Sequence, residues 1–200
     1  MSFHPLMAYD ERLHKAERKI LDEGPPFAFT PDRRATLDRI IGQYPPDQRR
    51  SAVLAALYLL QAQQGFLTAN GMRHVAEILG MTPAEVDDVA SYYVMFHKAP
   101  VGKYVLQVCR TLSCALMGAE RITEALAEKL GVGVGETDPT GTFTLQEFEC
   151  LGACDRAPVV MVNNEQWHEC LKPQDAARLV DEIRSKGAAA FSGCHLKVER

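Results

Sequence analysis

The sequence has 200 residues, of which 46% are hydrophobic and 24% are charged, a composition typical of a soluble chain with a sizeable core. Its net charge of −4 gives no basic surface of the kind that nucleic acid requires, so we expect no nucleic-acid partner. The most apolar run, residues 52–60, is far shorter than the roughly 20 residues of a bilayer span. The first residues show no basic region followed by an apolar one, as a signal peptide would. We therefore expect a cytoplasmic protein with no direct membrane insertion.

Residues 1–29 are predicted to form an extension rather than part of a domain. They are mostly polar, and the apolar positions between residues 10 and 21 are thinly spaced at about a helical period. The Gly24-Pro25-Pro26 run then breaks any helix.

Residues 30–98 are predicted to form a helical bundle. Thr82-Pro83-Ala84-Glu85 has the pattern of a capping box with proline at the first helical position. Thr68 is the expected start of the preceding helix, with Asn70 as an alternative cap. Apolar residues at helical spacing predict four helices, over residues 32–42, 48–64, 68–79 and 82–95. No catalytic cluster is found among them.

Residues 99–186 have a different pattern, in which short strands alternate with helices. The expected order is β-α-β-β-α, the outline of a thioredoxin-like layer with helices packed on one mixed sheet. Residues 187–200 form a tail without a clear element. The fold class is thus α+β, an N-terminal helical bundle followed by a thioredoxin-like α/β domain with strands over 103–108, 142–149, 159–162 and 166–168 and helices over 118–130 and 173–186.

Four cysteines occur in two close pairs. The spacing is C-x4-C, a gap of 35 residues, then C-x3-C, and each pair follows a predicted strand, so all four are expected in loops at strand ends. Disulfides are rare in the cytosol, so ligand-like spacing points to metal or redox chemistry. The predicted metal ligands are Cys109, Cys114, Cys150 and Cys154.

Spacing favours an iron–sulfur cluster over zinc only modestly. Zinc also takes four thiolates, but zinc ribbons usually bring two C-x2-C pairs. A Rieske site needs two histidines, and a thioredoxin-type oxidoreductase needs C-x-x-C, neither of which is present at the matching place. Cys170 and Cys194 lie outside the pattern and are expected to be buried packing residues.

The residues beside the cysteines suit a negatively charged cluster. Gly152 would let the backbone approach sulfur, and the hydroxyls of Thr111 and Ser113 are candidate donors. Two arginines are expected to offset the negative charge of the cluster, Arg110 and Arg156. Four apolar side chains are expected to exclude water from it, Leu112, Ala115, Leu151 and Ala153.

Two segments carry a specific resemblance. Cys109-Arg-Thr-Leu-Ser-Cys114 and Glu149-Cys-Leu-Gly-Ala-Cys-Asp-Arg-Ala-Pro-Val-Val-Met-Val-Asn163 resemble the iron–sulfur subunit beside the flavin subunit of respiratory complex I, NADH–quinone oxidoreductase. That family is the E-subunit family, homologous to the mitochondrial 24 kDa subunit, with a thioredoxin-like [2Fe–2S] ferredoxin domain. The helical segments 57–67 and 89–96 are similar to the same family, so the likeness covers roughly residues 30–185.

The resemblance implies that Cys109, Cys114, Cys150 and Cys154 bind one [2Fe–2S] cluster. It also implies that FMN and NADH bind a partner flavoprotein (F-type) subunit, that a G-type iron–sulfur subunit lies nearby, and that the chain is peripheral to the cytoplasmic side of the inner membrane. The glycine-rich run 131–135 lacks dinucleotide spacing and is predicted to be a helix stop. The alternatives are the equivalent subunit of an NAD-dependent hydrogenase or formate dehydrogenase, and a zinc-stabilised adaptor without redox role.

Overall fold

The computed structural model describes residues 26–191, and the chain divides into two compact units between Pro100 and Val101. The helix expected over residues 10–21 and the tail with Cys194 lie outside the described residues. Within the described region, no helix has both the length and the apolar character needed to span a bilayer.

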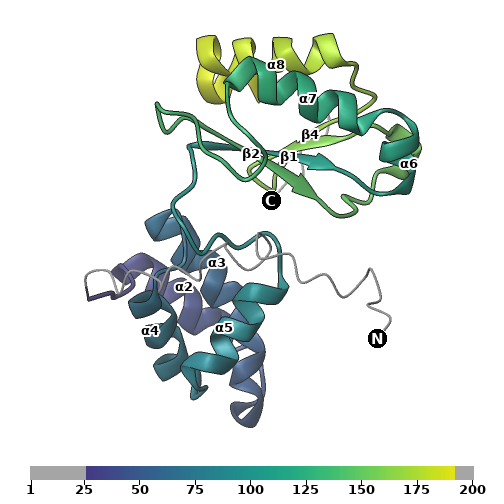
Figure 1. Cartoon of the computed structure of the whole chain (residues 1–200). Helices are drawn as coiled ribbons and strands as arrows, with labels where there is room; N and C mark the ends of the chain where they lie inside the picture. Colours follow the sequence, from purple (N-terminus) through teal and green to yellow (C-terminus); the bar gives the residue numbers. More distant parts are fainter. Residues whose placement is uncertain (1–25, 192–200) are drawn as a thin grey trace, which may run out of the picture. The chain divides into compact units, whose positions relative to one another are not determined.

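The first unit is helical, as predicted. Its core is formed by buried aliphatic side chains from every helix, including Leu37, Leu57, Val75 and Val86. The elements are α2 (Pro31–Ile41), the 3-10 helix η2 (Pro46–Ala52), α3 (Val53–Gln64), α4 (Ala69–Leu79) and α5 (Pro83–Tyr92) (Figure 1).

Two helix starts follow the predicted caps. The Thr82 hydroxyl accepts the Glu85 backbone N–H at 3.3 Å, and the Glu85 carboxylate accepts the Thr82 N–H at 2.8 Å, which completes the capping box. Thr68 caps α4 by accepting the Gly71 N–H at 3.1 Å. The alternative cap Asn70 is wrong, because it lies inside α4.

Two other helices differ from the prediction. The helix expected over residues 48–64 begins as η2, where the Arg49 guanidinium donates to the Leu79 carbonyl at the end of α4. The helix expected to reach residue 95 ends at Tyr92. Just beyond, the Gln61 amide donates to the Met95 carbonyl and accepts the His97 N–H, so these non-helical backbone groups are satisfied by a side chain.

The second unit contains one mixed four-stranded sheet. Its strand order is β2-β1-β3-β4, with β1 parallel to β2 and antiparallel to β3. The fold class is confirmed. The expected β-α-β-β-α order is one strand short, because three strands lie between the two long helices. The strands are β1 (Tyr104–Cys109), β2 (Phe143–Phe148), β3 (Val160–Val162) and β4 (Gln166–His168).

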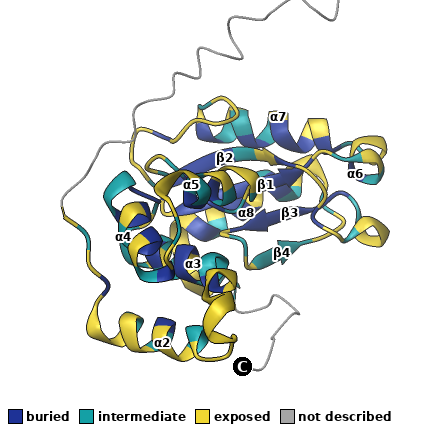
Figure 2. Ribbon diagram, turned by 90° about the horizontal axis from the view of Figure 1, so that it is seen from below, coloured by how far each residue is buried: buried dark blue, intermediate teal, exposed yellow. Residues whose placement is uncertain are grey.

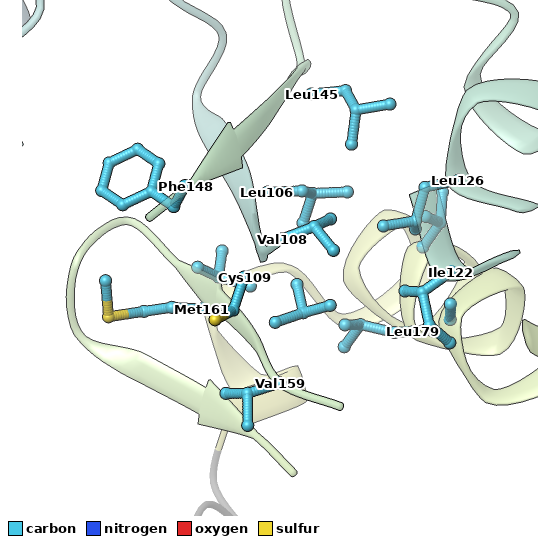
Figure 3. Close-up of a cluster of buried hydrophobic side chains, with 14 of the residues drawn as sticks. Leu106, Val108, Cys109, Ile122, Leu126, Leu145, Phe148, Val159, Met161 and Leu179 are labelled. Atoms are coloured by element: carbon cyan, nitrogen blue, oxygen red, sulfur yellow. The ribbon is translucent and has the colours of Figure 1, made fainter. Parts of the chain in front are cut away.

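Two long helices cover one face of this sheet, α7 (Ala119–Leu130) and α8 (Pro173–Lys186) (Figure 1). Figure 3 shows α7 side chains directed at Leu106, Val108 and Leu145 of the sheet, and all of these are fully buried. The tail was expected to lack structure, but the 3-10 helix η4 (Gly187–Phe191) follows α8. The ring centroid of Phe191 lies 6.0 Å from that of Tyr104.

The β3–β4 hairpin is fixed by a buried amide on the central strand. Asn163 and Asn164 have φ values of 55° and 59°, the left-handed conformation of the two central residues of a type I′ turn, which the Glu165 N–H closes onto the Val162 carbonyl at 3.1 Å. Gln107, which has no exposed surface, donates to the Asn164 side-chain oxygen at 2.6 Å and accepts the Asn164 N–H at 3.0 Å. Burial is tolerated because the amide is satisfied.

We predict that Gln107→Leu lowers the free energy of unfolding by about 1–3 kcal/mol, because it removes both hydrogen bonds between the Gln107 amide and Asn164. Denaturant unfolding of the purified variant measures this.

The matched control is Gln146→Leu, at the half-buried position that pairs with Gln107 on β2. We expect a smaller loss there. Equal losses in the two variants would mean that the bonds to Asn164 contribute nothing.

Candidate metal centre

The parallel pairing of β1 and β2 brings the two cysteine segments to one edge of the sheet. Cys109 is the last residue of β1 and pairs with Phe148, the last residue of β2. The Arg110 N–H continues the ladder by donating to the Phe148 carbonyl at 2.9 Å. Cys150 follows two residues later, so both pairs begin at the same place.

Only Cys150 lies in a loop as expected, because Cys109 ends β1 and the other two cysteines lie in helical turns. Cys114 lies in a short helix, α6 (Leu112–Leu116), and its side chain is buried. Cys154 begins a 3-10 turn, η3 (Cys154–Arg156), which packs beside α6. The second cysteine of each pair is therefore held by a helical turn.

The sulfurs of Cys150 and Cys154 are 3.8 Å apart. Two thiolates bound at about 2.3 Å to one tetrahedral metal are separated by about the same distance, ~3.8 Å. The Gly152 N–H donates to the Cys150 sulfur at 3.3 Å, and Gly152 has φ +81°. A Cβ at Gly152 would meet no atom within 4 Å, so glycine is needed for its backbone conformation and not, as expected, for close approach.

Burial and hydrogen bonds act in opposite directions on the first pair. Burial opposes ionisation of Cys109, yet its pKa is lowered, because the Thr111 hydroxyl and the backbone N–H groups of Leu151 and Thr111 donate to its sulfur. The Thr111 oxygen lies 3.3 Å from that sulfur. Burial, together with the neighbouring Cys109 thiol, raises the pKa of Cys114 to about 11, against the opposing effect of the Val159 N–H.

The second pair shows the same division. The Gly152 N–H lowers the pKa of Cys150, assisted by the Cys154 thiol and the Thr111 hydroxyl. The Cys150 thiol raises the pKa of Cys154, although the Ser113 hydroxyl lowers it. One thiol in each pair thus ionises easily and suppresses the other. A bound cation would remove that conflict, since coordinated thiols are deprotonated.

Other features bear on what this site can hold. All five described cysteines are free, and Cys109 and Cys114 are buried whereas Cys150 and Cys154 are exposed. Across residues 26–191, no three His, Cys, Asp or Glu side chains surround one point closely enough to hold a single metal ion. A two-iron cluster places no such demand, because it spreads four thiolates over two metals.

The arginines near the cysteines are paired with carboxylates. Arg110 forms an ion pair with Glu149, which raises the arginine pKa, and Arg156 lies 3.8 Å from Glu169 and 3.6 Å from Asp155. Their positive charge is thus largely matched locally. Sequence reasoning identified the arginines but missed these acidic partners.

The predicted apolar screen is only partly correct. Leu151 is 9% exposed, but Leu112 is 74% exposed and Leu116, on the same face of α6, is 78% exposed. The apolar residues of α6 therefore face outward instead of covering the cysteines (Figure 2).

Two further sequence expectations concern this unit. Cys170, expected to be buried, is exposed and has φ +51°. Gly131 ends α7 in the left-handed conformation, which agrees with the predicted helix stop.

The chain is similar to known proteins over most of its length. The profile of the thioredoxin-like [2Fe–2S] ferredoxin family matches residues 37–184. The chain belongs to this family. The resemblance predicted from the two cysteine segments is confirmed.

Two similar proteins are both named as subunits of NADH-quinone oxidoreductase. The E subunit of NADH-quinone oxidoreductase from Mycobacterium tuberculosis is 47% identical over 167 residues, 82% of this chain and 65% of the relative. The protein named subunit 2 of NADH-quinone oxidoreductase from Thermus thermophilus is 43% identical over 157 residues, 78% of this chain and 87% of the relative. The chain thus spans just under two thirds of the mycobacterial relative's length.

A solved structure has a similar fold. The NAD+-reducing [NiFe]-hydrogenase in its air-oxidized state superposes with a TM-score of 0.58 at 18% sequence identity, covering 67% of this chain and 23% of the hydrogenase chain. This likeness concerns the fold alone.

We predict that Gly152→Ala raises the pKa of Cys150, because an L-residue at φ +81° is strained by about 1–2 kcal/mol and relaxation would move the N–H away from sulfur. In metal-free protein, alkylation of Cys150 near neutral pH should slow, as measured residue by residue by mass spectrometry.

Gly118→Ala is the control, since Gly118 has φ +92° and equally open space but precedes α7. It should lose similar stability and leave Cys150 reactivity unchanged. Equal slowing in both variants would exclude a specific effect of the Gly152 N–H.

Proposed function

We propose that Cys109, Cys114, Cys150 and Cys154 hold one [2Fe–2S] cluster and that this chain is an electron-transfer subunit. The observation that carries the proposal is the meeting of two cysteine pairs at one sheet edge, with the Cys150 and Cys154 sulfurs spaced as for a shared metal. Membership of the [2Fe–2S] ferredoxin family supports it.

The donors around the sulfurs favour iron–sulfur over zinc. Thr111 and the N–H groups of Gly152 and Leu151 are directed at two of the sulfurs. Such bonds stabilise the extra negative charge of a reduced cluster. A structural zinc ion undergoes no change of charge, and its usual C-x2-C pairs are absent from the two segments.

A bound cluster would exchange one electron at a time. NADH gives up two electrons as a hydride, so a flavin is needed to pass them one at a time from NADH to the cluster. The described residues include no dinucleotide fingerprint, and the glycine-rich run ends a helix. We therefore assign FMN and NADH to a partner flavoprotein of the F type, with a G-type iron–sulfur subunit as a further neighbour. No catalytic residue is assigned to this chain.

The proposed host is NADH–quinone oxidoreductase, because the relatives reported above carry that name. The chain would then be a peripheral subunit on the cytoplasmic side of the inner membrane, attached through the complex. The fold is also similar to that of an NAD+-reducing hydrogenase. A second candidate function is therefore the equivalent subunit of such a soluble enzyme.

The first experiment is metal analysis of anaerobically purified protein. We expect two irons and two sulfides per chain, and an EPR signal on reduction. Cys114→Ser and Cys150→Ser should each lose or weaken the cluster, because a hydroxyl is a poorer ligand for iron in such clusters than thiolate.

Cys170→Ser is the matched control, since Cys170 is a further exposed thiol outside the two pairs, and it should retain the cluster. A colourless protein with one zinc, or loss of iron only in Cys170→Ser, would contradict the ligand assignment.

The second experiment tests the partner. Tagged chain should capture the F-type flavoprotein, and the captured pair should oxidise NADH with an artificial acceptor, whereas this chain alone should not. Capture together with a nickel-containing catalytic subunit would instead favour the hydrogenase. NADH oxidation by the isolated chain would refute the assignment of FMN and NADH to the partner.

A further inference from the structure

Thr111 occupies a helix N-cap position, but its hydroxyl does not cap the helix. It precedes α6 with φ −80° and ψ 172°, ordinary N-cap dihedrals, and its side chain accepts no backbone N–H of that helix. At the corresponding positions, Thr68 and Thr82 do accept such bonds. Thr30 lacks one as well, so a missing cap is not by itself informative.

What distinguishes Thr111 is the position of its oxygen, 3.3 Å from the Cys109 sulfur. Cys109 ends β1, and the neighbouring strand β2 leads directly into the segment of Cys150. Thr111 therefore contacts a predicted ligand sulfur at the place where the two cysteine segments leave the sheet.

The direction of the bond between Thr111 and Cys109 follows from the charge on sulfur. A metal-bound cysteine is a thiolate and has no proton to donate, so a hydroxyl beside it must be the donor. A donated hydrogen bond stabilises negative charge on sulfur, and the reduced cluster carries one more negative charge than the oxidised cluster. The hydroxyl is thus more favourable to the reduced form.

Resting on the cluster proposed above, we infer that Thr111 is a positioning residue that raises the reduction potential of the cluster by donating to the Cys109 sulfur. The Thr111 hydroxyl contacts this sulfur and does not cap α6.

The test is a reductive titration of the full chain with its cluster, using dithionite as the electron donor and EPR to follow the reduced form. Thr111→Val keeps the shape of the side chain and removes the hydroxyl, so its potential should be lower than that of the wild type. Thr111→Ser retains a donor and should stay close to the wild type. Thr111→Ala removes the hydroxyl without β-branching and should shift in the same direction as Thr111→Val.

Thr82→Val is the matched control, since it removes a hydroxyl that truly caps a helix in the other unit. Thr82→Val should lower the stability of the protein and leave the reduction potential unchanged. Thr111→Val should lower the reduction potential and leave the stability close to that of the wild type. A wild type without iron would refute the proposed function itself. The inference on Thr111 alone is overturned if a fully loaded Val or Ala variant keeps the wild-type potential, if Thr111→Ser shifts as far as Thr111→Val, or if only the hydroxyl variants assemble a cluster.

Discussion

The parallel pairing of β1 with β2 is the constraint on which the site depends. All six residues of β1 pair in register with β2, from Tyr104 opposite Phe143 to Cys109 opposite Phe148. Parallel strands run in the same direction, so both cysteine segments leave the sheet at one edge. An antiparallel arrangement would send Cys150 to the opposite edge. The long connection that parallel strands require is supplied by α6 and α7, and α7 also fills the core.

Much of this was predictable, because it rests on local patterns. The strands expected over residues 103–108 and 142–149 correspond to β1 and β2, and cysteine spacing indicated a metal site. The helix α6 was missed. It has five residues, too few for a 3.6-residue period to be visible, and its leucines are exposed. Apolar residues next to predicted ligands were assumed to point inward, and Leu112 does not.

The remaining differences arise from contacts between segments distant in sequence. Gln61 lies 34 residues from Met95, whose carbonyl its side chain binds, and Arg49 lies 30 residues from the Leu79 carbonyl. Each bond supplies a polar partner that local propensity does not include, and each accompanies a helix limit that sequence misjudged. The ion pair of Arg110 with Glu149 spans the two cysteine segments in the same way and balances charge where only positive charge was expected.

Exposure divides the four cysteines into two unlike halves. Cys109 and Cys114 are each 2% exposed, whereas Cys150 and Cys154 are on the surface. Thiols are oxidised in proportion to their ionisation and their access to oxidants. Cys150 meets both conditions, with a lowered pKa and an exposed sulfur only 3.8 Å from that of Cys154. Without the proposed cluster, we expect oxidation to begin at Cys150 and Cys154 rather than at the buried Cys109 and Cys114.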